Sequence, residues 1–122
     1  MNYEDRITKE YVEGAISDGI ANAIVCGAYT GDGTASQFIE LGFTPRAVLV
    51  MSRWGQVYEH GYFYHGGLCV TDAPVCDLLG NLVCQVVEGG FQVYAKTTDY
   101  GGTDFRVSAN LQNQLYRYLA VR

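Results

Sequence analysis

The sequence predicts an all-β fold, an antiparallel β-sandwich, with one N-terminal α-helix. From residue 24 onward, short stretches of apolar residues alternate with a period of two, and glycine-containing turns separate them. The composition agrees, because 15 glycines, 10 tyrosines and only 17% charged residues are typical of short strands joined by tight turns. We therefore expect an N-terminal helix within residues 1–23 and a sandwich domain over residues 24–122.

The helix is predicted over residues 5–23, where apolar residues recur at steps of three and four. They are Val12, Ala15, Ile16, Ile20, Ala23 and Ile24. Asp5 or Thr8 provides a cap, but Gly14 and Gly19 each cost about 1 kcal/mol relative to alanine in a helix interior. Such a helix must pack on a partner to be stable. Two partners stay open: the sandwich of the same chain, or the same helix of a neighbouring subunit.

The stretch from residue 29 to residue 50 predicts three strands. The first ends at Thr30, a tight Gly31-Asp32-Gly33 turn follows, and the second strand covers residues 36–41. The glycines are expected to supply positive φ for the turn, and Pro45 makes the corner before the third strand. Residues 47–51 are all apolar, which predicts a central strand buried on both faces.

The second half of the chain predicts one clear hairpin and several short strands. Residues 82–87 and 91–95 are strands joined by a turn at residues 88–90. Brief strands are expected at residues 68–70 and 105–107, and loops at residues 71–79 and 99–103. Residues 115–121 are dense in aromatic residues, so we expect a central C-terminal strand. Short strands at such intervals indicate a sandwich or a small barrel.

The charge balance argues against several classes of partner. A net charge of -5 and a pI near 4.8 disfavour binding to nucleic acid, which requires clustered lysine and arginine. No apolar run approaches the roughly 20 residues of a membrane span, and the N-terminus is too polar for a signal peptide. We expect that the chain does not insert into a membrane, and that it is synthesised in the cytoplasm.

The cysteines and histidines do not form a recognised motif. None of the spacings among Cys26, Cys69, Cys76 and Cys84 is C-x-x-C, so reduced and buried thiols are expected, with Cys69 and Cys76 the one pair to test for a disulfide. Cys69 near His65 is the only adjacent nucleophile and base, and no Gly-x-Ser-x-Gly elbow is present. We expect no enzyme, no catalytic residue and no cofactor.

The stretch WGQVYEHGYFYHGG, residues 54–67, is the candidate ligand site. Its candidate residues, with one aspartate beyond it, are Trp54, Tyr58, His60, Tyr62, Tyr64, His65 and Asp72. Aromatic faces can stack on the C–H groups of a sugar ring while polar side chains hold its hydroxyls. The alternative is that half of these aromatics are core and the rest line a subunit interface.

Two metal sites are conceivable but not expected. The two histidines with Asp72 or Asp77 form one candidate, although an exposed or hydrogen-bonded histidine is commoner. Residues 99–104 form the other, as a loop with paired aspartates for calcium or a receptor, although an ordinary hairpin connection is commoner. We expect no metal.

Three sequence blocks resemble a domain that recurs in phage and prophage tail and tail-fibre proteins. The blocks are YTGDGTASQFIELGFTPRAVLVM, GGFQVYA and LYRYLAVR, with Arg46 where lysine is common. The order of strands is also similar, more distantly, to the jelly-roll-like H-type lectins, which assemble as trimers or hexamers and bind N-acetylgalactosamine. No binding residue of those lectins matches here in register. The resemblance implies a trimeric tail-fibre or receptor-binding domain.

Together these observations predict a phage or prophage tail-associated protein, located in the virion. Its expected action is multivalent binding of a cell-surface saccharide by a homotrimer, with other phage tail proteins as further partners. The alternative is a purely structural virion adaptor or assembly protein without a ligand.

Overall fold

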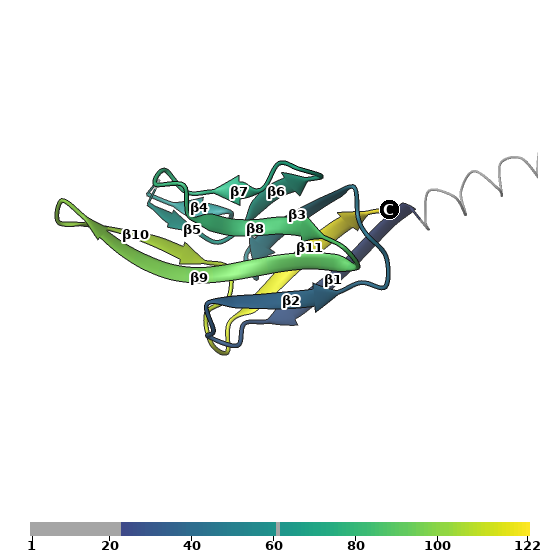
Figure 1. Cartoon of the computed structure of the whole chain (residues 1–122). Helices are drawn as coiled ribbons and strands as arrows, with labels where there is room; N and C mark the ends of the chain where they lie inside the picture. Colours follow the sequence, from purple (N-terminus) through teal and green to yellow (C-terminus); the bar gives the residue numbers. More distant parts are fainter. Residues whose placement is uncertain (1–22, 61) are drawn as a thin grey trace, which may run out of the picture.

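The computed structural model describes residues 23–60 and 62–122, and these are almost entirely β (Figure 1). Two curled sheets form a sandwich-like fold, which confirms the predicted fold class. The predicted N-terminal helix, residues 1–23, lies outside the described residues except for Ala23. The C-terminus lies beside the start of the first strand, because Arg122 N–H donates to the Ala23 carbonyl at 2.8 Å (Figure 1).

The first sheet has four strands in the order β1-β11-β3-β6, and every pair is antiparallel. Its strands are β1 (Ile24–Thr30), β11 (Leu115–Val121), β3 (Ala47–Ser52) and β6 (Gly67–Val70). The C-terminal strand β11 lies between β1 and β3, so its predicted central place is confirmed.

The second sheet has seven strands, six of them in the order β4-β5-β10-β9-β8-β7, with β2 also paired to β9. Its strands are β2 (Ser36–Glu40), β4 (Tyr58–Glu59), β5 (Phe63–Tyr64), β7 (Val75–Cys76), β8 (Leu82–Val87), β9 (Gly90–Tyr100) and β10 (Thr103–Ser108). One pair departs from the antiparallel prediction, because β5 and β10 run parallel.

The Gly31-Asp32-Gly33 segment lies between two strands, as predicted, but these strands do not pair with each other. Strand β1 pairs with β11 and β2 pairs with β9, so this turn carries the chain from one sheet to the other. Gly33 has φ +75°, as expected of a turn glycine. Gly31 is needed for another reason: a Cβ there would lie 2.0 Å from the backbone oxygen of Leu111.

Among residues 23–60 and 62–122, strand β3 is buried on one face only, so these residues do not provide the predicted burial on both faces. Val48 and Val50 are fully buried between the sheets. Ala47, Leu49 and Met51 point the other way and are only half-buried. The outer face of the four-stranded sheet is therefore not covered by the described part of the chain.

The predicted β8–β9 hairpin is confirmed, with Val87 opposite Gly90. Strand β9 is longer than predicted. It pairs with β2 and β8 through its first half and with β10 through its second half, which ends in a Gly101-Gly102 turn in place of the predicted loop. Its length lets one strand belong to both halves of the second sheet.

Four aromatic rings hold the two sheets together. Tyr29 stacks on Tyr116 with ring centroids 5.1 Å apart and meets Phe91 edge-on at 6.0 Å. Phe91 also packs on Tyr118 at 5.1 Å. The buried hydroxyls have partners, because Tyr29 donates to the Ala109 carbonyl at 2.6 Å and Tyr116 donates to the Ser108 carbonyl. Burial raises the pKa of Tyr29, so the phenol stays neutral.

A hydrogen-bonded network fixes the β1–β2 turn against the loop before β11. Asp32 Oδ1 accepts from the backbone N–H of Thr34 at 2.9 Å and from Asn110 Nδ2 at 2.7 Å. Asn110 is fully buried and also donates to the Thr34 carbonyl at 3.0 Å. The hydroxyl and backbone N–H of Thr34, with the Asn110 amide, hold the pKa of Asp32 below its ordinary value.

This network predicts a specific pH dependence. Because the folded-state pKa of Asp32 is depressed, its carboxylate stabilises the fold above the unfolded-state pKa of about 3.9, and this contribution is lost as the pH falls through the folded-state value. We expect the urea midpoint to fall on acidification below about pH 4, and to fall less steeply in Asp32→Asn. Urea unfolding at a series of pH values measures this. Parallel curves for the two proteins would show that Asp32 contributes nothing.

Candidate functional site

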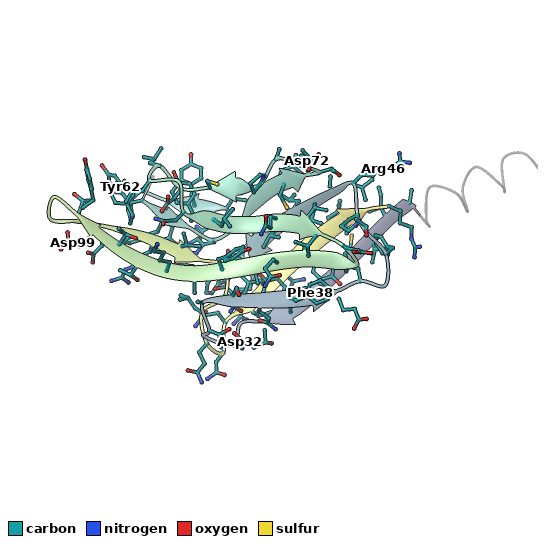
Figure 2. The ribbon with its side chains drawn as sticks, in the orientation of Figure 1. Asp32, Phe38, Arg46, Tyr62, Asp72 and Asp99 are labelled. Atoms are coloured by element: carbon teal, nitrogen blue, oxygen red, sulfur yellow. The ribbon has the colours of Figure 1, made fainter. Side chains whose placement is uncertain are left out.

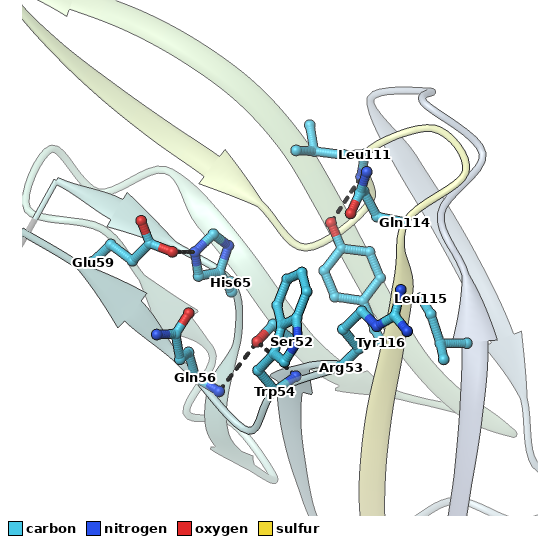
Figure 3. A pocket seen from close by; sticks show the side chains of 10 residues that line it. All are labelled: Ser52, Arg53, Trp54, Gln56, Glu59, His65, Leu111, Gln114, Leu115 and Tyr116. Atoms are coloured by element: carbon cyan, nitrogen blue, oxygen red, sulfur yellow. Dashed lines mark hydrogen bonds and ion pairs between the residues drawn. The ribbon is translucent and has the colours of Figure 1, made fainter.

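A hollow of about 70 Å³ lies beside Trp54, at the end of β3 (Figure 3). We call it the Trp54 pocket. It is lined by Ser52, Arg53, Trp54, Gln56, Glu59, His65, Leu111, Gln114, Leu115 and Tyr116. These residues come from three parts of the chain: the turn after β3, the short β4–β5 pair, and the loop leading into β11.

The turn after β3 fixes the backbone at Trp54. The hydroxyl oxygen of Ser52, itself buried, accepts hydrogen bonds from the backbone N–H groups of Trp54 at 3.3 Å and Gln56 at 3.1 Å. Gly55, with φ +81°, donates to the Ser52 carbonyl at 2.9 Å and closes the turn. The indole is left 73% exposed, with the Arg53 guanidinium 5.2 Å from its ring centroid.

The opposite wall carries an ionisable pair. His65 Nε2 lies 3.2 Å from Glu59 Oε1, and both side chains are partly accessible. The backbone N–H of His65 donates to the Val57 carbonyl at 2.7 Å. The following residue must be glycine, because a Cβ at Gly66 would lie 2.0 Å from the Val50 oxygen. The histidine is thereby held close to the end of β3.

The third wall is brought in by strand pairing. Tyr116 lies opposite Ser52 in the β11–β3 register, so Gln114 and Leu115 reach the pocket from the far end of the sequence. The hydroxyl of Tyr116 accepts from the backbone N–H of Leu111 at 3.1 Å and fixes this loop. Figure 3 shows side chains from these three walls converging around the indole.

The chemistry of the pocket suits a small polyol. The indole offers a flat apolar face, while two amides, a carboxylate and an imidazole offer donors and acceptors around it. The hollow is well below the 300 to 1,000 Å³ of pockets that enclose drug-sized ligands. A ligand would therefore lie on the surface with about one ring unit in contact.

The structure brings only some of the sequence-predicted site residues to this pocket. Trp54 and His65 line it. Tyr58 lies opposite Tyr64 in the β4–β5 pair, with ring centroids 6.4 Å apart, and Tyr58 is 59% exposed. These two tyrosines belong to the strand pair that also supplies Glu59.

The remaining predicted site residues lie elsewhere. His60 meets Phe63 edge-on at 6.1 Å, and Tyr62 packs edge-on against Phe105 at 5.1 Å. Asp72 lies at the other end of β3, because Val70 of the preceding strand pairs with Ala47 whereas Trp54 follows Ser52. Figure 2 shows Asp72 well separated from Tyr62.

Several pocket residues were missed by sequence reasoning. Gln56 and Glu59 lie within the aromatic stretch, and their position between its aromatic residues was the signal available in the sequence. Gln114 lies in a polar loop far along the chain, and only the β3–β11 register places it here. Arg53 is recognisable only from its position over the indole.

The candidate metal and nucleophile groups do not assemble in the described residues. No group of three or more histidine, cysteine or carboxylate side chains is placed there to hold a metal ion. Asp77 instead accepts from the backbone N–H groups of Leu79 and Asn81. Cys69 is fully buried and donates to the Val48 carbonyl at 3.4 Å, whereas His65 pairs with Glu59.

The four thiols are free, so Cys69 and Cys76, the one pair to test for a disulfide, are not bonded to each other. Cys76 is exposed, while Cys69 is buried with Cys84 as its neighbour. The neighbouring Cys69 side chain, together with burial, raises the pKa of Cys84. Cys84 therefore stays protonated and unreactive at neutral pH.

Comparison of the chain with protein-family models, curated proteins and solved structures yields no match. The resemblance to tail-fibre domains therefore stays a prediction from the three sequence blocks. In residues 23–60 and 62–122, no helix has the length and hydropathy needed to cross a membrane.

Proposed function

We propose that this chain is a phage or prophage tail-associated protein that recognises a host-surface saccharide at the Trp54 pocket as a homotrimer. The observation that carries the proposal is the state of Trp54. The largest aromatic side chain of the protein is 73% exposed, yet its turn is fixed by hydrogen bonds to a buried serine. A large apolar ring held in water beside polar groups supports a binding role over a packing role.

The surrounding charges favour a neutral ligand. Glu59 lies at the pocket and the chain has a net charge of -5, so a phosphate backbone would be repelled. The guanidinium of Arg53 is placed over the indole. One face of the indole and the amides of Gln56 and Gln114 are left for a ring with hydroxyl groups.

A hollow this small supports only weak binding by one copy, which is why multivalency belongs to the proposal. Several weak sites on one rigid assembly can exceed the affinity of a single site by about 10²- to 10⁴-fold when all engage the same surface. Three copies in a homotrimer would supply this gain. No catalysis is needed, and we propose that the protein is not an enzyme.

The alternative is a structural adaptor without a ligand. The open apolar face of the four-stranded sheet favours it, because such a face suits assembly with another protein surface. In that case Trp54 would be buried in an assembled tail, in contact with another protein.

Binding to glycan-coated surfaces, together with mass by light scattering, separates these functions. We expect a mass of three chains and binding to a saccharide subset that is at least about 100-fold tighter on dense surfaces than to the free sugar. A monomer at every concentration would remove the basis for avidity. A folded trimer that binds no glycan would favour the adaptor. Release of fragments from a bound polysaccharide would instead indicate an enzyme.

A further inference from the structure

The four-stranded sheet turns one face into the sandwich and leaves the other open. Its strand register places the outward side chains in three cross-strand rows. The rows are Ile24, Val121, Ala47 and Val70; Cys26, Leu119, Leu49 and Leu68; and Ala28, Arg117 and Met51. We call these residues the outer face. Leu68 is 63% exposed, Ile24 44% and Val70 39%, so the described residues leave this apolar surface uncovered.

The outer face carries no negative charge. Arg117 is the only charged residue in the four strands, which contain no aspartate or glutamate. Two further arginines flank one end: Arg46 N–H donates to the Val121 carbonyl, and Arg122 N–H to the Ala23 carbonyl, both at 2.8 Å. A partner that fits this surface is apolar along its middle and acidic around it.

Residues 1–22 have this chemistry. They contain five acidic residues against two basic ones, a net charge of -3. These are Glu4, Asp5, Glu10, Glu13 and Asp18, against Arg6 and Lys9. Val12, Ile16 and Ile20 recur at a step of four, which gives one apolar stripe if the segment is helical.

The connection to the sheet brings this segment to one end of the outer face. Residue 22 is followed by Ala23 and then by Ile24, which belongs to the first row. A helix of 22 residues is about 33 Å long and a strand of seven residues about 23 Å, so the segment is long enough to run along the face. Its covalent attachment also gives a high effective concentration.

We infer that residues 1–22 dock on the outer face, with the stripe of Val12, Ile16 and Ile20 against the apolar rows. The acidic residues of the segment then lie near Arg117, Arg46 and Arg122. The segment comes from the same chain or from a neighbouring copy, and in the second case it links subunits. This inference does not depend on saccharide binding.

The four native cysteines provide the test. Cys26 lies in the second row of the outer face, Cys76 is exposed on β7, and Cys69 and Cys84 are fully buried. The full-length chain is treated with a maleimide under native conditions, and the modified residues are identified by peptide mass spectrometry. We expect Cys76 to react and Cys26 to react at least about tenfold more slowly, because a docked segment must open first.

Matched variants test the stripe. Ile16→Asp is expected to bring the rate at Cys26 up to that at Cys76. Ala21→Asp makes the same change about 140° away around a helix and should leave Cys26 slow. Leu68→Asp on the outer face should also release Cys26, whereas Leu78→Asp, at a similarly exposed leucine in the β7–β8 loop, should not. Unreactive Cys69 and Cys84 show that each variant is folded.

The outcomes are distinct. Protection of Cys26 that is lost in Ile16→Asp supports the docked segment. If the protection of Cys26 does not depend on protein concentration, the docked segment belongs to the same chain. If the protection is lost on dilution, the segment comes from a neighbouring copy. Equal rates at Cys26 and Cys76 in the unmodified sequence would overturn the inference. Protection that persists in Ile16→Asp and disappears only on dilution would also overturn it, because a second copy of the sheet would then be the cover.

Discussion

Trp54→Ala is expected to weaken saccharide binding about thirtyfold and to leave the fold unchanged. Removing a central aromatic anchor from a binding surface costs about 2 kcal/mol, which corresponds to this factor. The indole is 73% exposed, so its removal leaves no cavity in the core, and the free energy of unfolding should change by less than about 0.5 kcal/mol. Isothermal titration with a saccharide identified on the glycan surface measures the first quantity, and urea unfolding the second.

Tyr100→Ala is the matched control for this variant. Tyr100 is an aromatic residue with 67% exposure at the tip of β9, where it meets Phe105 edge-on at 6.5 Å and does not line the Trp54 pocket. Its replacement should leave saccharide affinity unchanged. Equal affinity in Trp54→Ala and the unmodified protein would place the binding site elsewhere, whereas equal losses in both variants would point to a diffuse aromatic surface.

Phe91→Ala is expected to cost about 3 to 5 kcal/mol of folding free energy, far more than the replacement of an exposed aromatic residue. Phe91 is fully buried on β9 and contacts the rings of Tyr29 and Tyr118 in the opposite sheet. Its removal leaves a cavity where the two sheets meet. A domain of this size loses at least about 4 °C in melting temperature per kcal/mol, so thermal unfolding should shift down by more than about 12 °C.

Phe38→Ala provides the comparison on a neighbouring strand. Phe38 lies on β2, which also pairs with β9, but its side chain is 45% exposed. We expect its replacement to lower the melting temperature by only a few degrees, because little cavity forms. Similar shifts for the two variants would mean that Phe91 does not occupy the core between the two sheets.

The strands that could be predicted are those whose side chains alternate clearly. The strand at residues 115–121 was predicted with its observed bounds and its central place, because dense aromatic and aliphatic residues are typical of a strand that has a neighbour on each edge. The β8–β9 hairpin was predicted because a Glu88-Gly89-Gly90 turn joins two regular stretches. Local pattern was sufficient in both cases.

Pairing across the sandwich was not predictable from local pattern. A period of two does not show which strands are neighbours, so the Gly31-Asp32-Gly33 turn has the pattern of a hairpin although it joins the two sheets. The apolar run of β3 predicts burial on both faces, because half-exposed Leu49 and Met51 are indistinguishable in sequence from buried residues. The sequence of one strand does not show which of its faces another part of the protein covers.

The candidate site was likewise predictable only where its residues are close together in sequence. Trp54 and His65 are near in sequence, and their aromatic context indicated a shared surface before the structure placed both at one pocket. Gln114 is brought there only by the β3–β11 register, and Asp72 is carried away by β6. Likewise, Cys69 has Cys84 as its neighbour, although Cys76 is nearer in sequence.

Recognition of a saccharide at the Trp54 pocket is tested most directly by the indole N–H resonance of Trp54. The chain contains one tryptophan, so this signal is unambiguous in a ¹⁵N-labelled sample. Titration with saccharides from the glycan surface is predicted to shift the indole signal until it saturates. The backbone amide signal of Tyr100 is predicted to stay unchanged. An indole signal that no saccharide moves at millimolar concentration, in a protein shown to be folded and trimeric, would contradict recognition at this pocket.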